Sequence, residues 1–261
     1  MRILNGIAIS YNWRYLWTYA QFLFSQSSSA DHPTFFVSEI VVLENVVISL
    51  SFRADRRAYI VRHFNSIGIP FKFFDALHGS KDSGQINASV QFSARSKEYL
   101  SSGSIGCIAS HITVWKQLLN STADAYLVFE DDVIILSKYD EILRMLGQVP
   151  ADFDLVYLGS RSIQSWLNLK HVYGNIYEPF SIRKGAYAYL LSKTGALKLL
   201  EETKEIKITC GGIDTILGVA TMRNKLVTYH LKPGIAGVNF SFTSNIRNFS
   251  DNSKTLHQTE F

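Results

Sequence analysis

The chain has 261 residues, of which 47% are hydrophobic and 18% charged, and its formal net charge is +4 at pH 7. This composition excludes a disordered chain and supplies enough apolar side chains for one large α/β domain or two small ones. The basic residues are scattered, which argues against nucleic acid as the partner and permits weak attraction to anionic membranes or phosphorylated ligands.

The two cysteines, Cys107 and Cys210, are too few and too far apart for a disulfide framework or a zinc knuckle, so a reducing compartment is expected. No apolar segment reaches the length of a transmembrane helix. Residues 1–42 carry few charges and many aromatic rings, and we expect an N-terminal appendage with a short amphipathic helix. Tyr15 to Phe24 has the outline of a signal peptide, although polar residues interrupt it.

The first regular elements are expected after residue 44. A β-branched run over 46–50 predicts a buried strand, and the stretch 54–67 predicts a helix that Gly68 and a proline end. A second strand is expected over 71–74. This order opens a parallel α/β sheet, in which ligands gather at the carboxyl ends of the strands. The charged residues at these ends are Arg53, Asp55 and Asp75.

The segment 79–104 is polar, and we expect a surface loop or lid there. It leads into a helix that extends to Leu119. Helical spacing puts His111 on the same face as Cys107 and Trp115. His111 is therefore either a buried, hydrogen-bonded core residue or part of a ligand pocket.

The most informative stretch is 126–136, where Glu130, Asp131 and Asp132 stand between two apolar runs. Such a run predicts a buried strand, with the acids where it leaves the core. Three adjacent carboxylates repel one another, and a hard divalent cation with oxygen ligands would compensate that repulsion. The alternative is that the acids cap a helix or face solvent.

The second half of the chain predicts a helix over 141–146, strands over 153–159 and 185–191, a helix over 193–203 and a late strand over 226–233. Two further candidate groups come from this half. Asp214 stands at the start of a helix beside two glycines that leave room for a ligand, although it is equally placed to be a helix N-cap. His230, near the end of the late strand, is a possible metal ligand.

Several of these segments together resemble glycosyltransferase family 25, which includes bacterial lipooligosaccharide glycosyltransferases and procollagen galactosyltransferases. The resemblance covers about Val46 to Pro233. The segments are Val47 to Leu50 with Arg53, Asp55, Arg56 and Arg57, then Phe73 to Ala76, Gly106 to His111, Val128 to Val133, Gly185 to Tyr187, and Asp214.

The resemblance implies an α/β chain with the A-type nucleotide-sugar glycosyltransferase fold, a mostly parallel Rossmann-like sheet flanked by helices. The catalytic domain would span 43–240, between the appendage and a flexible polar tail at 241–261. The resemblance also implies a UDP-sugar donor, usually UDP-galactose, inversion at the sugar carbon, and a divalent metal, commonly Mn²⁺. A lipooligosaccharide acceptor would place the protein in the cytoplasm, peripheral to the inner face of the cytoplasmic membrane.

Carried over residue by residue, the resemblance makes Asp132 the first candidate for a metal ligand and places Glu130 nearer the ribose. Glu130, Asp131 and His230 are the further candidates for the metal shell. Asp214 is the expected catalytic base, because the acceptor hydroxyl must lose a proton as it attacks. The donor-binding candidates are Arg53, Asp55, Arg57, Asp75, His111, Gly185 and Gly212.

The chain departs from the family pattern at two places. Ser104 replaces an acidic residue that relatives often carry, which weakens the expectation of a catalytic carboxylate in that loop, and the first 42 residues have no family counterpart. Two other functions use the same residues. One is a metal-dependent nucleotide-sugar hydrolase or phosphotransferase, and the other is a catalytically silent carbohydrate-binding or scaffold protein.

Overall fold

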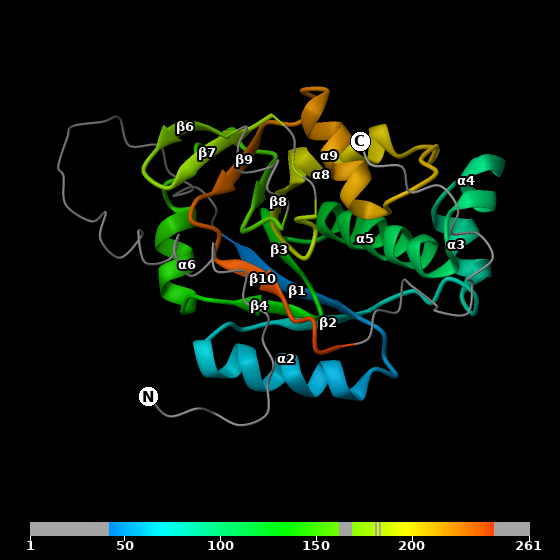
Figure 1. Cartoon of the computed structure of the whole chain (residues 1–261), viewed down its shortest axis with the longest axis horizontal. Helices are drawn as coiled ribbons and strands as arrows, with labels where there is room; N and C mark the ends of the chain where they lie inside the picture. The colour runs from blue at the N-terminus through cyan, green and yellow to red at the C-terminus, as the bar shows by residue number, and fades with distance from the viewer. Residues whose placement is uncertain (1–41, 162–168, 181, 183, 243–261) are drawn as a thin grey trace.

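An eight-stranded sheet forms the centre of the molecule (Figure 1). The computed structural model describes residues 42–161, 169–180, 182 and 184–242. In spatial order the strands are β2 (Lys72–Asp75), β1 (Leu43–Ser49), β3 (Ala125–Glu130), β8 (Ala188–Ser192), β5 (Leu155–Tyr157), β9 (Thr228–Leu231), β7 (Ile176–Pro179) and β6 (Leu169–Tyr173). A separate two-stranded sheet pairs β4 (Val133–Ile135) with β10 (Ala236–Val238).

The sheet is parallel at one end and mixed beyond it. Strand β1 pairs in parallel with β2 and β3, as the strand, helix, strand order predicts. Strand β8 is antiparallel to both β3 and β5, while β5 is parallel to β9. Strands β1, β3, β5 and β9 therefore point the same way, and their carboxyl ends share one edge. The predicted α/β fold is confirmed, with a mixed sheet at its centre.

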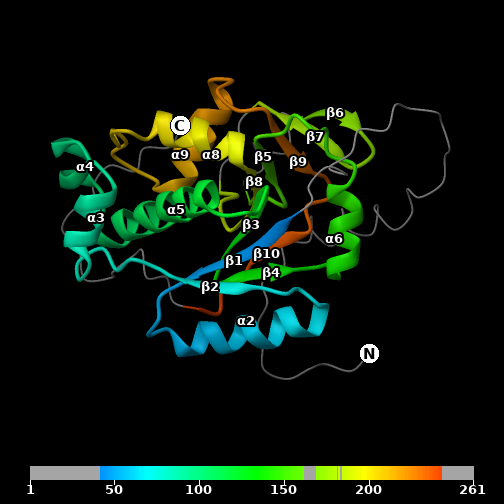
Figure 2. The same cartoon turned by 180° about the vertical axis from the view of Figure 1, so that it is seen from behind.

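Helices cover both faces of this sheet. Figure 1 shows α2 (Ala54–Ile67) on one side, with α5 (Ser102–Asn120), α8 (Lys193–Glu202) and α9 (Ile213–Met222) on the other, and Figure 2 shows the same layers from behind. Helix α6 (Tyr139–Leu146) packs on the α2 side. Within β3 the alternation of a strand divides the core, since Tyr126 and Val128 join the α5 cluster and Leu127 and Phe129 the α2 cluster.

Helix α2 spans the predicted residues because its sequence supplies both a buried apolar face and a glycine that ends it. Ile60 and Phe64, one turn apart, are both fully buried against the sheet. The helix ends at Gly68, which adopts a left-handed conformation with φ 78° and donates its N–H to the Phe64 carbonyl. This short connection delivers the chain to β2 beside β1.

The loop expected over 79–104 is wrong, because the segment contains α3 (Ser83–Ser89), α4 (Ala94–Tyr99) and the start of α5. Two of its serines act as helix N-caps. The Ser93 hydroxyl accepts the Ser96 N–H at 3.1 Å, and the Ser101 hydroxyl accepts the Ser104 N–H at 3.1 Å.

The acidic stretch also differs from one continuous strand. Strand β3 ends at Glu130, Asp131 and Asp132 form a turn, and the following β4 leaves the main sheet to pair with β10. No helix among the described residues is both long and apolar enough to cross a membrane. Nearly all of the predicted appendage and of the predicted tail lies outside the described residues.

Candidate active site

The acidic turn lies at the carboxyl edge of the sheet and is fixed from two sides. Glu130 is the last residue of β3. The backbone carbonyl of Asp132 accepts the Asn239 N–H at 2.7 Å, which ties the turn to the segment after β10. The three acids therefore stand where ligands collect in sheets of this kind.

Asp131 is held inside the protein rather than presented to a ligand. One carboxylate oxygen pairs with the buried Arg56 guanidinium, which also lies 3.2 Å from Oδ2 of Asp132. The other oxygen accepts the Ser49 hydroxyl at 2.8 Å. Because both oxygens are engaged and Asp131 is only 6% exposed, we assign it to anchoring α2 and β1 to the turn.

Glu130 and Asp132 form the part of the turn that is left for a cation. Burial, followed by the charges of Asp214 and Asp131, raises the pKa of Glu130 to about 8. Burial, followed by the charge of Glu130, raises the pKa of Asp132 to about 7. Oδ1 of Asp132 is buried without a hydrogen-bond partner among the described residues. Crowded carboxylate oxygens of this kind fit a hard divalent cation.

His111 lies beside Glu130, and hydrogen bonds on the other side of its ring bear on its tautomer. The Trp115 indole N–H donates to the Tyr189 oxygen at 2.9 Å, so the Tyr189 hydroxyl is free to donate to Nδ1 of His111, 2.8 Å away. Nε2 then carries the proton, and it lies 3.4 Å from Oε1 of Glu130. Burial lowers the pKa of His111 to about 4, which keeps the ring neutral. His111 is thus both a buried core residue and a neighbour of the acidic turn.

Cys107, His111 and Glu130 bring three possible ligand atoms within 4.8 Å of one another, the one such group in the described part of the chain. Burial raises the pKa of the Cys107 thiol, which opposes the thiolate form that a soft metal requires. Nε2 of His111 is also occupied by its proton. These states favour an uncharged thiol and imidazole beside Glu130 rather than a metal centre.

The structure does not bring His230 into that group. His230 is fully buried, its Nε2 lies 3.1 Å from the Ser160 hydroxyl, and its ring stacks on Tyr157. Burial lowers its pKa to about 4. We therefore treat His230 as a core residue that supports the loop after β5, and we leave it out of the proposed metal shell.

Asp214 joins the acidic turn from a different element. Gly212 is the N-cap of α9, so the predicted alternative of Asp214 as the N-cap is wrong. Its Oδ1 instead accepts the N–H groups of Gly185 at 2.9 Å and Ala186 at 3.0 Å, which links α9 to the loop before β8. Oδ2 accepts no hydrogen bond from a described residue. Because the Asp214 charge raises the pKa of Glu130, both groups belong to one electrostatic site.

The two glycines predicted to bind the donor differ in their surroundings. Gly212 has φ 80°, which favours glycine, and a Cβ there would find its nearest neighbour, Ser104 Oγ, 4.0 Å away. Gly212 therefore leaves open space beside the start of α9. A Cβ on Gly185 would come within 2.8 Å of the Tyr157 ring, so Gly185 is required by packing.

The arginines predicted to bind the donor are paired with carboxylates. Arg53 makes two hydrogen bonds to Asp55, at 2.9 and 2.7 Å, and this contact lowers the pKa of Asp55 to about 2. Arg57 pairs with Asp75 and donates to the Ser49 carbonyl at 2.9 Å. The four predicted residues, which come from the loop after β1, the start of α2 and the end of β2, thus form two ion pairs.

Sequence reasoning missed Arg161, in the loop after β5. Its guanidinium carbon lies 4.7 Å from the centre of the Phe240 ring, and its charge lowers the pKa of both Glu130 and Asp132. A basic residue just beyond the carboxyl end of a predicted strand was the available signal.

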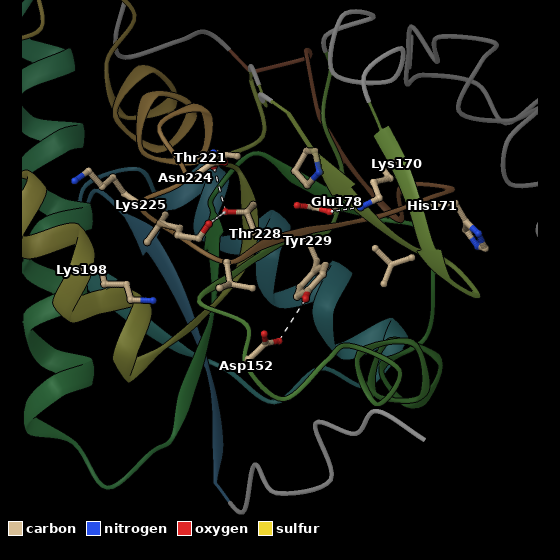
Figure 3. Close-up of a pocket in the computed structure, with 14 residues that line it drawn as sticks. Asp152, Lys170, His171, Glu178, Lys198, Thr221, Asn224, Lys225, Thr228 and Tyr229 are labelled. Carbon is tan, nitrogen blue, oxygen red and sulfur yellow. Dashed lines mark hydrogen bonds and ion pairs between the residues drawn. The ribbon is translucent and has the colours of Figure 1, made fainter. Parts of the chain in front are cut away.

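A large cavity lies at the other edge of the sheet. It has a volume of about 660 Å³ and surrounds the amino ends of β5 and β9, where the Tyr229 hydroxyl donates to Asp152 at 3.3 Å (Figure 3). None of the predicted site residues lines it. Cavity size therefore does not locate the candidate site, which rests on the gathered acids.

The chain matches the family model for glycosyltransferase family 25, described as an LPS biosynthesis protein family, over residues 42–216. A Haemophilus influenzae protein is 29% identical over 66% of this chain and 64% of its own length. Lacto-N-neotetraose biosynthesis glycosyltransferase LgtB of Neisseria meningitidis is 42% identical over 43% of this chain and 41% of its own. Lipooligosaccharide biosynthesis protein lic2B of Haemophilus influenzae is 28% identical over 59% and 61%.

These matches leave more than a third of each relative's length uncovered, since they span 64%, 41% and 61% of the three proteins. The family match itself includes the acidic turn, His111 and Asp214. The chain belongs to glycosyltransferase family 25.

Proposed function

We propose that this chain is an inverting glycosyltransferase that moves a hexose, galactose being our first choice, from a UDP-sugar to a lipooligosaccharide acceptor. One observation carries the proposal. Asp214, from the start of α9, lies near enough to Glu130 at the end of β3 for its charge to raise the pKa of Glu130, and Asp132 belongs to the same turn as Glu130. The names of the related Neisseria and Haemophilus proteins support a transferase acting in lipooligosaccharide biosynthesis.

Glu130 and Asp132 would hold a divalent cation, Mn²⁺ in our proposal, and that ion would supply positive charge for the departing diphosphate. The oxygen donors and the unpartnered Asp132 Oδ1 support this assignment. The buried ion pair between Arg56 and Asp131 holds the turn in place. The carboxylates of Glu130 and Asp132 therefore need not reorganise when the donor binds.

Asp214 is the proposed catalytic base. Its Oδ1 is held by two backbone N–H groups, which leaves Oδ2 to accept a proton. The acceptor oxygen forms a bond to the anomeric carbon as the bond from that carbon to the diphosphate oxygen breaks. The hydroxyl proton moves to Asp214, and the diphosphate leaves with the bonding electrons. Attack opposite the leaving group inverts the anomeric centre.

The acceptor in this proposal is a glycolipid, so the protein would work at the inner face of the cytoplasmic membrane. The net charge of +4 supports weak peripheral contact with anionic lipid.

The test is a transfer assay with the full chain, Mn²⁺ and a terminal-hexose oligosaccharide acceptor. UDP-galactose, UDP-glucose and UDP-N-acetylglucosamine are compared as donors, with mass spectrometry for product and NMR for the anomeric configuration. A lengthened oligosaccharide with inverted configuration supports the proposal. Free hexose formed without acceptor would favour the hydrolase, and donor binding without any product would favour the silent carbohydrate-binding alternative.

A further inference from the structure

The candidate site has a charge imbalance that its paired arginines do not correct. Four carboxyl groups surround it with two guanidinium groups: Glu130, Asp131, Asp132, Asp214, Arg56 and Arg161. When all are ionised, two negative charges are in excess. A divalent cation would cancel that excess, but a diphosphate brings further negative charge into the same space.

The arginines near β1 are poor candidates for binding that diphosphate. Arg53 is held by Asp55, Arg57 by Asp75, and Arg56 is buried against the acidic turn. Each would have to exchange a carboxylate for a phosphate, and the gain from that exchange is small because one anion replaces another.

Arg161 is in a different state. Within the described part of the chain it has no carboxylate partner, and the contact recorded for its guanidinium is the Phe240 ring. The backbone of Arg161 itself is held, since its N–H donates to the Lys184 carbonyl at 3.1 Å. The Phe240 side also has support, because the neighbouring Asn239 donates to the backbone of Asp132. Both partners of the stack are thus tied to the borders of the site.

We propose that Arg161, stacked on Phe240 beside the acidic turn, binds the phosphate groups of the nucleotide donor. This inference rests on the proposed function. A guanidinium stacked on a ring keeps its edge N–H groups available, and those groups match the paired oxygens of a phosphate. Phe240 is 57% exposed, so the stack stands at the surface where a donor can reach it. Arg161 is therefore a binding residue for the leaving group, distinct from the base.

The experiment measures the affinity of the full chain for UDP by calorimetry and for uridine by competition, at one fixed Mn²⁺ concentration. We expect R161Q to weaken UDP binding about 10- to 100-fold, the loss expected for charge-assisted hydrogen bonds, and to leave uridine binding within twofold. R161K keeps the positive charge but lacks the planar guanidinium, so its UDP affinity should lie between those of wild type and R161Q. F240L removes the supporting ring and should weaken UDP binding a few fold.

The matched control is R95Q. Arg95 also stacks on an exposed ring, at 5.9 Å from the centre of Tyr99, but on α4. R95Q should leave both affinities unchanged. UDP binding by R161Q within twofold of wild type would overturn the inference, as would an equal loss of uridine binding, which would indicate a structural role. Wild-type protein that transfers hexose while R161Q binds UDP normally would refute only this inference. Wild-type protein that binds no UDP would refute the proposed function as well.

Discussion

The Tyr189 hydroxyl lies 2.8 Å from Nδ1 of His111, and the hydrogen bond between them bears on which imidazole nitrogen of His111 carries the proton. Because Trp115 can only donate to Tyr189, the Tyr189 proton can point to His111, and we assign the Tyr189 hydroxyl as the donor. In this assignment the neutral His111 carries its proton on Nε2, facing Glu130. A core contact between α5 and β8 thereby reaches the proposed cation ligands.

Removing that hydroxyl tests the direction of the chain. Tyr189→Phe leaves the Trp115 N–H and Nδ1 of His111 unpartnered, and we expect a loss of about 1–3 kcal/mol in the free energy of unfolding. It should also release the His111 tautomer, visible as a change in its ring ¹⁵N shifts. Urea unfolding and NMR are the measurements. Tyr99→Phe, at an exposed ring, is the control, and unchanged ring shifts in Tyr189→Phe would contradict the assignment.

Replacing Asp132 or Asp131 by asparagine should change two different properties, the metal dependence of UDP binding for Asp132 and the stability of the fold for Asp131. Asp132→Asn takes one charge from the proposed cation site and should abolish the Mn²⁺ dependence of UDP binding while the fold persists. Calorimetric titration of UDP with and without chelator measures this. Asp152→Asn, in the distant cavity, is the control and should leave the dependence intact. Metal-dependent affinity that survives in Asp132→Asn would remove Asp132 from the ligand set.

Asp131→Asn should act on stability instead. It leaves Arg56 with Asp132 as its charged partner in the turn, so we expect a loss below the about 3–5 kcal/mol that a fully broken buried ion pair costs. Thermal and urea unfolding of the variant measure the loss. A variant that is as stable as wild type but binds UDP without metal dependence would show that Asp131, rather than Asp132, belongs in the site.

Much of the fold was predictable because its signals are local. Helix α2 is set by its own apolar spacing and by Gly68, and the strand before Glu130 is set by its apolar run. The serines of 79–104 were misinterpreted because the same residue type favours loops and helix caps, and only hydrogen bonding separates the two.

The sequence indicates which carboxylates could form the candidate site, but it does not indicate how the arginines around them are paired. Strand ends identify which residues share an edge, so Asp132 could be placed at that edge from the sequence, whereas Asp214 was a candidate because it follows two glycines at the start of a helix. Which arginine forms an ion pair with which carboxylate depends on distances in the folded chain, and the spacing of residues in the sequence does not give those distances. Arg56 proved to be the buried partner of Asp131, and Arg57 the partner of Asp75, 18 residues away. Arg161 follows the predicted strand over 153–159, and the spacing of residues does not show that its guanidinium stacks on Phe240.

Asp214→Asn should separate chemistry from binding. The amide cannot accept the acceptor's proton, so transfer should fall by about two to four orders of magnitude, the range for a lost general base. UDP affinity should stay close to that of wild type, because Asp214 lies outside the proposed cation ligands. Initial-rate kinetics and calorimetry on the same preparation are needed. If UDP affinity falls in parallel with the rate, Asp214 belongs to the donor pocket instead.

Acid should destabilise the protein through its buried histidines. Burial lowers the pKa of His230 from 6.5 to about 4, so the unfolded chain binds a proton between these values that the folded protein does not. Stability therefore falls as the pH drops from about 6.5 to 4, and His230 alone contributes at most about 3 kcal/mol. Urea unfolding at pH 6.5 and 4.5 measures the slope. His230→Gln should flatten it, whatever its effect at neutral pH, while His171→Gln, at an exposed hairpin position, should leave it unchanged. An unaltered slope in His230→Gln would mean that His230 is protonated without penalty inside the fold, and the loop after β5, with Ser160 and Arg161, would then lack the neutral support assigned to it here.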